Sequence, residues 1–232
     1  QGLTLQQAQS RVHMFDIKGL LEPSRTDLVD FQKPYAHSHA PCTDFAAAIR
    51  DLKPTTIIGV STIGGAFSRD VVSAMCEVNE RPIILALSNP TDHAECTAEQ
   101  AYNWSGGKAI FAAGVQFDPV KIGSTTYLPG QANNFYIFPA VGMAIFATRA
   151  TRVTDQMFIE AASAVADQVP ADLLKQGLLY PQQGNILETE IRTAARVAKL
   201  VFDSGLARVE RPKDYEAFIR QQVYTPTYKS LA

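Results

Sequence analysis

The chain has 232 residues, of which 46% are hydrophobic and 19% are charged, and its formal net charge is −2 at pH 7. This length and composition suit one sizeable α/β core, or one domain with a helical appendage. Lys and Arg are scattered rather than clustered, which argues against nucleic acid or an anionic membrane surface as a partner and leaves small anionic ligands open.

Strand-like and helix-like segments alternate through the first half of the chain. Four short apolar runs predict strands, at residues 11–15, 55–60, 82–87 and 109–113. Three segments between them predict helices, at residues 43–52, 68–78 and 97–104, with Thr43, Ser68 and Thr97 as N-caps. This alternation predicts an α/β fold with a doubly wound, Rossmann-like parallel sheet, in which right-handed crossovers gather the functional loops at the carboxyl ends of the strands.

Helices replace strands after about residue 135. We expect them at residues 137–150, 154–169, 188–203 and 212–223. The apolar stretch at residues 135–147 contains prolines and glycines and is shorter than the roughly 20 residues that span a bilayer, so burial in a protein core explains it better than a membrane does. We therefore expect a partial nucleotide-binding domain at residues 1–150 and a helical extension at residues 151–232 packed on it.

Asp16 ends the first predicted strand. An acid in this place accepts both hydroxyls of an adenosine ribose, which favours NAD over a 2′-phosphorylated cofactor; the alternative is a strand-end acid that caps the next turn. The Gly-x-Gly-x-x-Gly loop that should precede it by about 20 residues is absent. Because the chain begins at Gln1 rather than Met, we expect an N-terminally truncated sheet, with that loop just upstream.

The loop from Gly59 to Phe67 follows a predicted buried strand and opens a helix. Its glycines would let backbone N–H groups approach a ligand, which makes Ser61 a candidate cofactor-binding residue; a plain strand-to-helix turn is the alternative. Ser61 is not expected to be a nucleophile, because Ile63 stands where the Gly-x-Ser-x-Gly pattern needs glycine.

Two further amide-bearing segments lie where ligands bind in such folds. Asn89 directly follows the strand predicted at residues 82–87, and its carboxamide offers a donor and an acceptor to a hydroxy acid or to nicotinamide; alternatively it only shapes a proline-containing turn. Asn133 and Asn134 lead into an apolar helix, where one would be the cap and the other a ligand group. Glu95 and Asp92, near Asn89, are interpreted as turn and cap residues rather than as an acid/base pair.

The histidines and cysteines predict no metal site. The four histidines lack metal-ligand spacing, and the three cysteines are odd in number, far apart and free of CxxC spacing. The cysteine pattern also argues against a disulfide framework, so we expect a reducing, cytoplasmic location.

Several strings, in this order, resemble malic enzymes, the NAD(P)-dependent decarboxylating malate dehydrogenases. They are His13-Met-Phe-Asp16, Lys53-Pro-Thr-Thr-Ile-Ile-Gly-Val-Ser61, Leu87-Ser-Asn-Pro-Thr91 with Ala94-Glu-Cys-Thr97, and Pro129-Gly-Gln-Ala-Asn-Asn-Phe-Tyr-Ile-Phe-Pro139. The resemblance covers most of residues 1–205. It departs from the family at Gly114-Val-Gln-Phe117, where Gly-Ser-Pro-Phe is common, and at Ala132, where glycine is usual.

The resemblance implies roles for individual residues. The position of Asp16 contacts the adenosine ribose, and those of Asn89 and Asn133 contact malate or the nicotinamide region. Gln32 falls where NAD-preferring members resemble this chain and NADP-preferring members carry lysine, although Lys33 is the next residue and a one-place shift would reverse that inference.

The resemblance also implies the reaction. The whole enzyme would convert (S)-malate to pyruvate and CO2 with reduction of NAD, using Mg or Mn. The catalytic acid/base pair and the metal ligands would lie upstream, so we assign no catalytic residue and no metal ligand here and expect the chain alone to be inactive. We expect a homo-oligomer, a dimer or tetramer, and keep two alternatives: a malolactic enzyme, which releases lactate, and a non-catalytic nucleotide-sensing module.

Overall fold

The computed structural model describes residues 2–224 and divides the chain into two compact units. The first unit is Gln1–Pro129 and the second is Gly130–Ala232. The division falls about 20 residues before the boundary expected at residue 150, because helix α5 (Phe138–Thr148) buries Ala140, Ala144 and Ala147 in the apolar cluster of the second unit.

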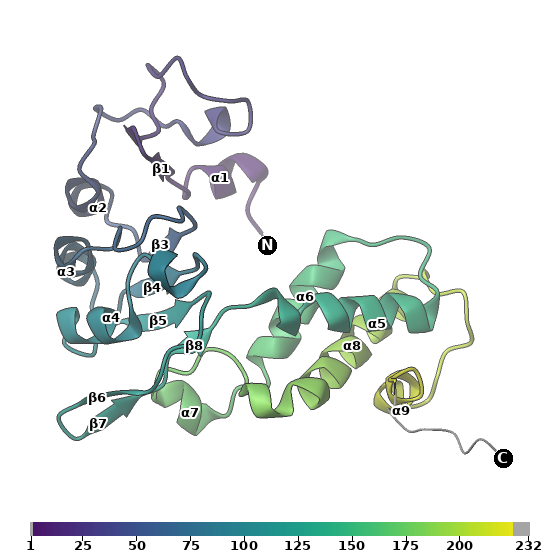
Figure 1. The fold of residues 1–232 in the computed structure, drawn as a ribbon. Coiled ribbons are helices and arrows are strands. Elements are labelled where there is room, and N and C mark those ends of the chain that lie inside the picture. The colour runs from purple at the N-terminus through teal and green to yellow at the C-terminus, as the bar shows by residue number, and fades with distance from the viewer. Residues whose placement is uncertain (1, 225–232) are drawn as a thin grey trace. The chain divides into compact units, whose positions relative to one another are not determined.

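Three parallel strands form the centre of the first unit (Figure 1). They are β3 (Thr56–Gly59), β4 (Ile83–Ala86) and β5 (Ile110–Ala113), paired with Gly59 opposite Ala86 and Ala86 opposite Ala113. Helices α2 (Phe45–Leu52), α3 (Arg69–Val78) and α4 (Ala98–Trp104) stack side by side along these strands. The predicted α/β, Rossmann-like order of strands and helices is confirmed.

Apolar side chains between these strands and helices make the core of the first unit. Val72, Met75, Ile84, Tyr102 and Phe111 are fully buried. Full burial of one such aliphatic or aromatic side chain contributes about 1.5–3 kcal/mol. Strand β3 alternates, with Ile57 buried and Ile58 58% exposed, so one face of this strand is packed and the other is open.

The helix caps of the first unit are mostly those that the sequence predicts. The hydroxyl oxygens of Ser68 and Thr97 accept hydrogen bonds from backbone N–H groups in the first turns of α3 and α4. Helix α2 is capped by Asp44 rather than by Thr43, because the Asp44 carboxylate accepts from the N–H of Ala47.

The strand expected at residues 11–15 is reduced to Phe15–Asp16 (β1), which pairs antiparallel with Gly19–Leu20 (β2). Its backbone groups find their partners in this short hairpin, not in the parallel sheet. The first unit also contains elements that the sequence reading missed: α1 (Leu5–Gln9), η1 (Lys33–Tyr35), η2 (Thr91–His93), β6 (Val120–Ile122) and β7 (Thr125–Tyr127).

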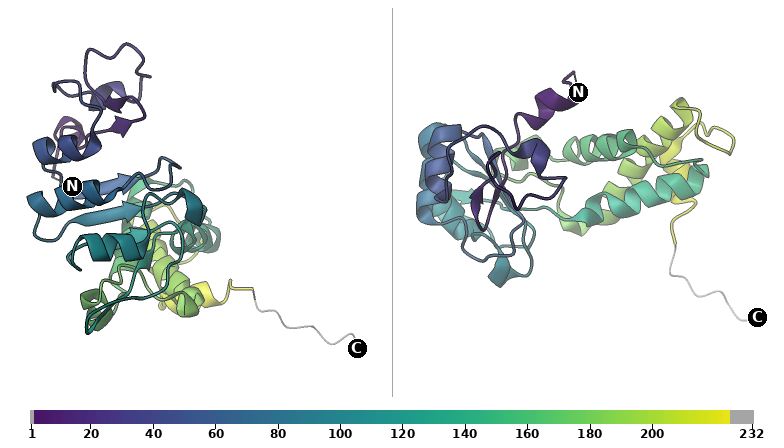
Figure 2. Two further views of the ribbon diagram at one scale, coloured as in Figure 1. Left: turned by 60° about the vertical axis from the view of Figure 1, so that its left-hand side comes forward. Right: turned by 90° about the horizontal axis from the view of Figure 1, so that it is seen from above.

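The second unit is mainly helical. It contains β8 (Gly130–Gln131), η3 (Asn134–Tyr136), α5, α6 (Asp155–Ala166), α7 (Ala171–Lys175), η4 (Gln183–Asn185), α8 (Ile186–Asp203) and α9 (Tyr215–Arg220). Helix α8 is central and packs against α5, α6 and α9 (Figures 1 and 2). Close helix packing is possible because small side chains lie at the contacts. These are the fully buried alanines Ala144 on α5 and Ala194 and Ala198 on α8. Within residues 2–224, no helix is long and apolar enough to cross a membrane.

Candidate functional site

Two loops lie at the carboxyl edge of the parallel strands. Ser61 follows β3, and Asn89 follows β4. The last backbone hydrogen bond between these two segments runs from the N–H of Leu87 to the carbonyl of Gly59, at 2.9 Å. In open α/β sheets this edge is where ligands bind. The structure therefore brings two of the predicted site residues, Ser61 and Asn89, to one edge of the first unit.

A buried carboxylate joins these two loops. Glu95 is fully buried, and its Oε1 accepts from the backbone N–H of Ser61 at 3.0 Å, the Ser61 hydroxyl at 3.2 Å and the Ser88 hydroxyl at 2.5 Å. Its Oε2 accepts from the backbone N–H of Ser88 at 3.3 Å. Burial by itself would raise the pKa of Glu95, but these hydrogen bonds outweigh it and lower that pKa. The carboxylate is therefore ionised at neutral pH.

The loop after β3 is also held by backbone contacts. The N–H groups of Gly65 and Phe67 donate to the carbonyls of Ala94 and Glu95 at 3.1 and 2.9 Å. A Cβ at Gly64 would collide with the carbonyl oxygen of Asp92, so only glycine fits there. Thr62 adopts a left-handed conformation, with φ of 57°, and a ring nitrogen of His93 lies 2.8 Å from its carbonyl oxygen.

Asn89 is exposed at the tip of the second loop and is joined to Pro90 by a cis peptide bond. Its amide nitrogen lies 3.5 Å from the carbonyl oxygen of Leu87, which is a weak contact at best. A Cβ at Gly114, just after β5, would collide with that carbonyl oxygen and lie 3.0 Å from the Asn89 amide nitrogen. Glycine at position 114 therefore leaves room for Asn89, whose carboxamide is free to meet a ligand.

Asp16 lies in the β1–β2 hairpin and is held by Arg25, which the sequence reading did not single out. Two guanidinium nitrogens of Arg25 donate to the two carboxylate oxygens of Asp16 at 2.9 and 2.7 Å, and the backbone N–H of Lys18 donates at 2.8 Å. The hydrogen bond from Arg25 is the main cause that lowers the pKa of Asp16. Asp16 is therefore a fixed, ionised acceptor.

Arg25 also binds a second carboxylate. Its Nη2 lies 2.8 Å from Asp27, which in turn lies 3.0 Å from Lys18, and the Arg25 side chain is only 11% exposed. Hydrogen bonds from Arg25 and Lys18 hold the pKa of Asp27 well below its usual range. The group around Asp16 therefore contains two carboxylates and two cationic side chains in close contact.

Gln32 is engaged in a local turn. Its side-chain oxygen accepts from the backbone N–H of Val29 at 3.1 Å, and the neighbouring Lys33 pairs with Asp30 at 2.7 Å. Within residues 2–224, no hydrogen bond joins Gln32 to Asp16. The two residues that predict NAD preference are thus held by separate sets of contacts.

Asn133 belongs to the second unit and serves as the N-cap of η3. Its side-chain oxygen accepts from the N–H of Phe135 at 3.1 Å, whereas α5 begins only at Phe138, so the asparagines do not lead directly into the apolar helix as expected. Among the described residues the side-chain NH2 of Asn133 has no hydrogen-bond partner. The cap and the ligand group that the sequence assigned to two residues can therefore both belong to Asn133.

Three histidines come together in the first unit, which their spacing did not indicate. The ring centroids of His37 and His39 lie 5.0 and 5.2 Å from that of His13, and burial, followed by the charges of these neighbours, lowers the pKa of His13. Even so, no group of three or more His, Cys, Asp or Glu side chains in the described part of the chain is arranged to hold a metal ion.

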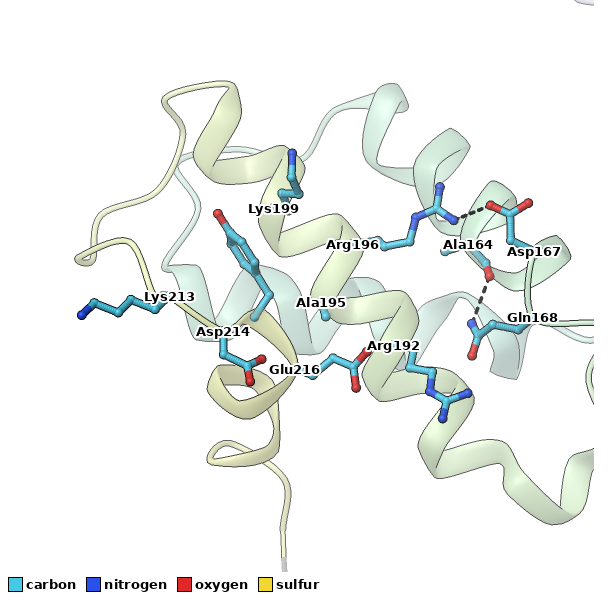
Figure 3. A pocket seen from close by; sticks show the side chains of 11 residues that line it. Ala164, Asp167, Gln168, Arg192, Ala195, Arg196, Lys199, Lys213, Asp214 and Glu216 are labelled. Carbon is cyan, nitrogen blue, oxygen red and sulfur yellow. Dashed lines mark hydrogen bonds and ion pairs between the residues drawn. The ribbon is translucent and has the colours of Figure 1, made fainter.

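A groove in the second unit lies between the end of α6, the middle of α8 and the start of α9 (Figure 3). Its volume is about 780 Å³, and it contains none of the predicted cofactor- or substrate-binding residues. Its charges are of both signs, and Arg196 pairs with Asp167 at 2.5 Å and with Glu160 at 2.7 Å. Because its charges are mixed and partly paired, the groove does not favour an anion of the size of a nucleotide phosphate.

Comparison with known proteins decides the family. The family described as "Malic enzyme, NAD binding domain" matches residues 1–202. The chain belongs to the malic enzyme family. NADP-dependent malic enzyme 2 of Arabidopsis thaliana is 45% identical over 231 residues, which are 99% of this chain and 39% of that protein. The NADP-dependent malic enzyme of Vitis vinifera is 44% identical over 228 residues, 97% of this chain and 39% of that protein.

Solved malic enzyme structures share the fold. The crystal structure of the Entamoeba histolytica malic enzyme has a TM-score of 0.69 at 23% identity, covering 90% of this chain and 40% of that one. That of the malic enzyme from Pyrococcus horikoshii Ot3 has a TM-score of 0.60 at 23% identity, covering 83% of this chain and 41% of that one. The chain thus spans about two-fifths of the malic enzymes that it matches.

Proposed function

We propose that the full-length protein carrying this chain converts (S)-malate to pyruvate and CO2 with reduction of NAD, and that this chain binds the nucleotide and orients the substrate. The single observation that carries the proposal is the family match over residues 1–202. The placement of Ser61 and Asn89 at one carboxyl edge of the parallel strands supports it, because that edge is where such sheets bind ligands.

Four of the five predicted site residues contact a ligand in this proposal. Asp16 accepts hydrogen bonds from the adenosine ribose, Ser61 contacts the cofactor through its loop, and Asn89 and Asn133 offer amides to malate or nicotinamide. The bound nicotinamide would accept the hydride from C2 of malate. Orienting the reactants in this way contributes several kcal/mol, within the roughly 7–11 kcal/mol that ideal positioning can supply.

Mg or Mn is part of the proposed reaction, where it would polarise a carbonyl and stabilise an enolate. The described residues offer no suitable ligand set, so the proposal assigns the metal ligands and the acid/base pair to the rest of the protein.

The preference for NAD rests on Asp16 and Gln32. NADP is the alternative, and two observations favour it: the relatives at 44–45% identity are named NADP-dependent, and Arg25 lies against Asp16, where a 2′-phosphate would attract it. Against this, Arg25 is already paired with the carboxylates of Asp16 and Asp27. A 2′-phosphate bound to Arg25 would therefore also be repelled by the negative charge of Asp16.

Steady-state kinetics of the full-length protein with (S)-malate and Mn test the proposal. We expect formation of pyruvate and NADH, with kcat/KM for NAD at least tenfold above that for NADP. The reverse order would make this an NADP enzyme, and lactate without NADH would make it a malolactic enzyme. Nucleotide binding without any turnover would instead favour a sensing module.

Cellular location and assembly are also proposals. We propose a cytoplasmic protein because its three cysteines are free, with Cys42 and Cys76 half-buried and Cys96 buried.

We propose a homo-oligomer, a dimer or tetramer, because the second unit exposes large apolar side chains on α5, Phe138 at 76% and Phe146 at 71%. Light scattering of the purified full-length protein measures its mass, and a monomer would contradict the second proposal.

A further inference from the structure

Glu95 occupies an unusual chemical position in the first unit. It is a fully buried carboxylate, and no Lys or Arg of the described residues pairs with it. Burying an ionised group without a cation is costly unless hydrogen bonds compensate, and here four donors from two serines do so. An apolar side chain at position 95 would leave these four donors without an acceptor, so the charge of Glu95 serves the two loops that carry Ser61 and Ser88.

The donors of Glu95 define the start of both ligand-facing loops. The last backbone bond between these segments runs from Leu87 to Gly59, and beyond it the Glu95 carboxylate bridges Ser61 and Ser88 in place of the backbone. Since Asn89 is the next residue after Ser88, this bridge sets the distance between the Ser61 loop and Asn89.

The same bridge sets the direction of the two hydroxyls. Ser88 donates its proton to Glu95 and accepts from the N–H of Thr62 at 2.9 Å. Ser61 likewise donates to Glu95 and accepts from the N–H of Ile63 at 3.3 Å. Both chains of hydrogen bonds end on the Glu95 carboxylate, which in its ionised form can only accept hydrogen bonds. The ionised form therefore orders three consecutive N–H groups of the first loop, those of Ser61, Thr62 and Ile63.

Position 59 has no room for a side chain beside this carboxylate. A Cβ at position 59 would overlap the Cδ and Cγ of Glu95, so the side chain passes directly over the end of β3. Glycine at 59 and glutamate at 95 are thus sterically matched, which is more than a turn or cap residue would require.

We infer that Glu95 is a positioning residue for the proposed reaction: its ionised carboxylate holds the Ser61 loop and Asn89 at the spacing that nicotinamide and malate need, without touching either. This inference rests on the proposed function and adds a residue that the family resemblance did not assign. In the proposed function Asp16 of the separate β1–β2 hairpin binds the adenosine, and loss of Glu95 leaves that contact in place, so it should impair turnover more than cofactor affinity.

The test replaces Glu95 by Gln in the full-length protein. The amide has nearly the same shape, but its NH2 would face serine donors, so at least one hydrogen bond is lost. We expect kcat for malate oxidation to fall 10- to 100-fold, since a misplacement of about 1 Å costs on the order of 100-fold, while the Kd for NADH changes less than threefold. Glu95→Asp, which keeps the charge, should recover part of the lost kcat. Glu99→Gln, an exposed change four residues away on α4, is the matched control and should leave kcat unchanged.

Ser88→Ala gives a second, milder variant if Glu95→Gln does not fold. It removes one donor and leaves the carboxylate, and we expect kcat to fall 3- to 10-fold with an unchanged Kd for NADH. Wild-type kcat in the folded variants, or a parallel loss of kcat, NADH affinity and thermal stability, overturns the positioning role. If the wild-type protein itself does not oxidise malate, the proposed function fails and this inference falls with it.

Discussion

Arg25 holds the Asp16 carboxylate in one orientation. The bidentate contact fixes the carboxylate plane, and the hydrogen bond from Lys18 fixes one of its oxygens, so in the proposed role the side chain is already ordered before a ribose binds. The Asp16 side chain is still 32% exposed and keeps room for a further donor. A preorganised acceptor of this kind increases affinity by reducing the entropy that is lost on binding.

Replacing Asp16 by Asn tests this role in the full-length protein. We expect kcat/KM for NAD to fall about 10- to 100-fold, because hydrogen bonds to a charged group contribute about 1.5–3 kcal/mol. We expect a smaller fall, or a gain, for NADP, since the amide does not repel a 2′-phosphate. Asp51→Asn, an exposed change on α2, is the control, and an unchanged ratio of the two kcat/KM values in Asp16→Asn would contradict the assignment.

Asp16 also gives a pH dependence of stability. Its pKa is lowered in the folded protein, so its contribution to the free energy of unfolding is complete above the ordinary carboxyl pKa and is lost as the pH falls through the lowered value. Urea unfolding should therefore show wild type more stable than Asp16→Asn at pH 7, with the difference shrinking below about pH 4. A difference that grows toward acid pH would mean that the ion pair does not stabilise the fold.

Glycines at element ends decide how closely the loops approach the strands. Gly114 follows β5, and the space that a Cβ would need is filled by the carbonyl oxygen of Leu87. Gly142 lies inside α5, and a Cβ there would meet no other atom within 4 Å. A methyl group would therefore clash at position 114 and be accommodated at position 142.

Alanine substitutions at the two glycines form a matched pair. Gly114→Ala should lower the free energy of unfolding by about 1–3 kcal/mol, the usual cost of overpacking, and should also raise KM for malate because Asn89 is displaced. Gly142→Ala should raise it by about 0.5–1 kcal/mol, because alanine favours a helix more than glycine does. Urea titrations of both variants measure this, and equal effects at the two sites would contradict the packing described.

At the scale of the whole molecule, the chain is two compact units that together span about two-fifths of the relatives' length. The described residues supply ordered loops, amides and a fixed acceptor, but no group arranged to hold a metal ion. Orientation alone does not remove the C2 hydroxyl proton of malate or protonate the enolate, two steps that the proposed reaction requires.

We accordingly expect the purified 232-residue chain to form no NADH from malate, NAD and Mn under conditions where the full-length protein is active. Absorbance at the NADH band measures this directly. Turnover by the 232-residue chain would show that the acid/base groups lie within it and would refute the division of labour proposed here.

The sequence by itself determined the α/β class, the order of strands and helices, two of the three predicted caps and the loops that carry Ser61 and Asn89. These follow from periodicity and turn chemistry, which depend on residues a few positions apart. The family strings added Gln32 and the ligand role of Asn133, and the contacts of both residues with ligand stay predictions.

Only the tertiary structure decided which residues meet. Glu95, interpreted from the sequence as a turn or cap residue, binds Ser61 across 34 positions; Arg25 holds Asp16; and His13 lies beside His37. The strand expected at residues 11–15 became half of a hairpin for the same reason. Such contacts depend on the path of the chain between the residues, which local patterns do not specify.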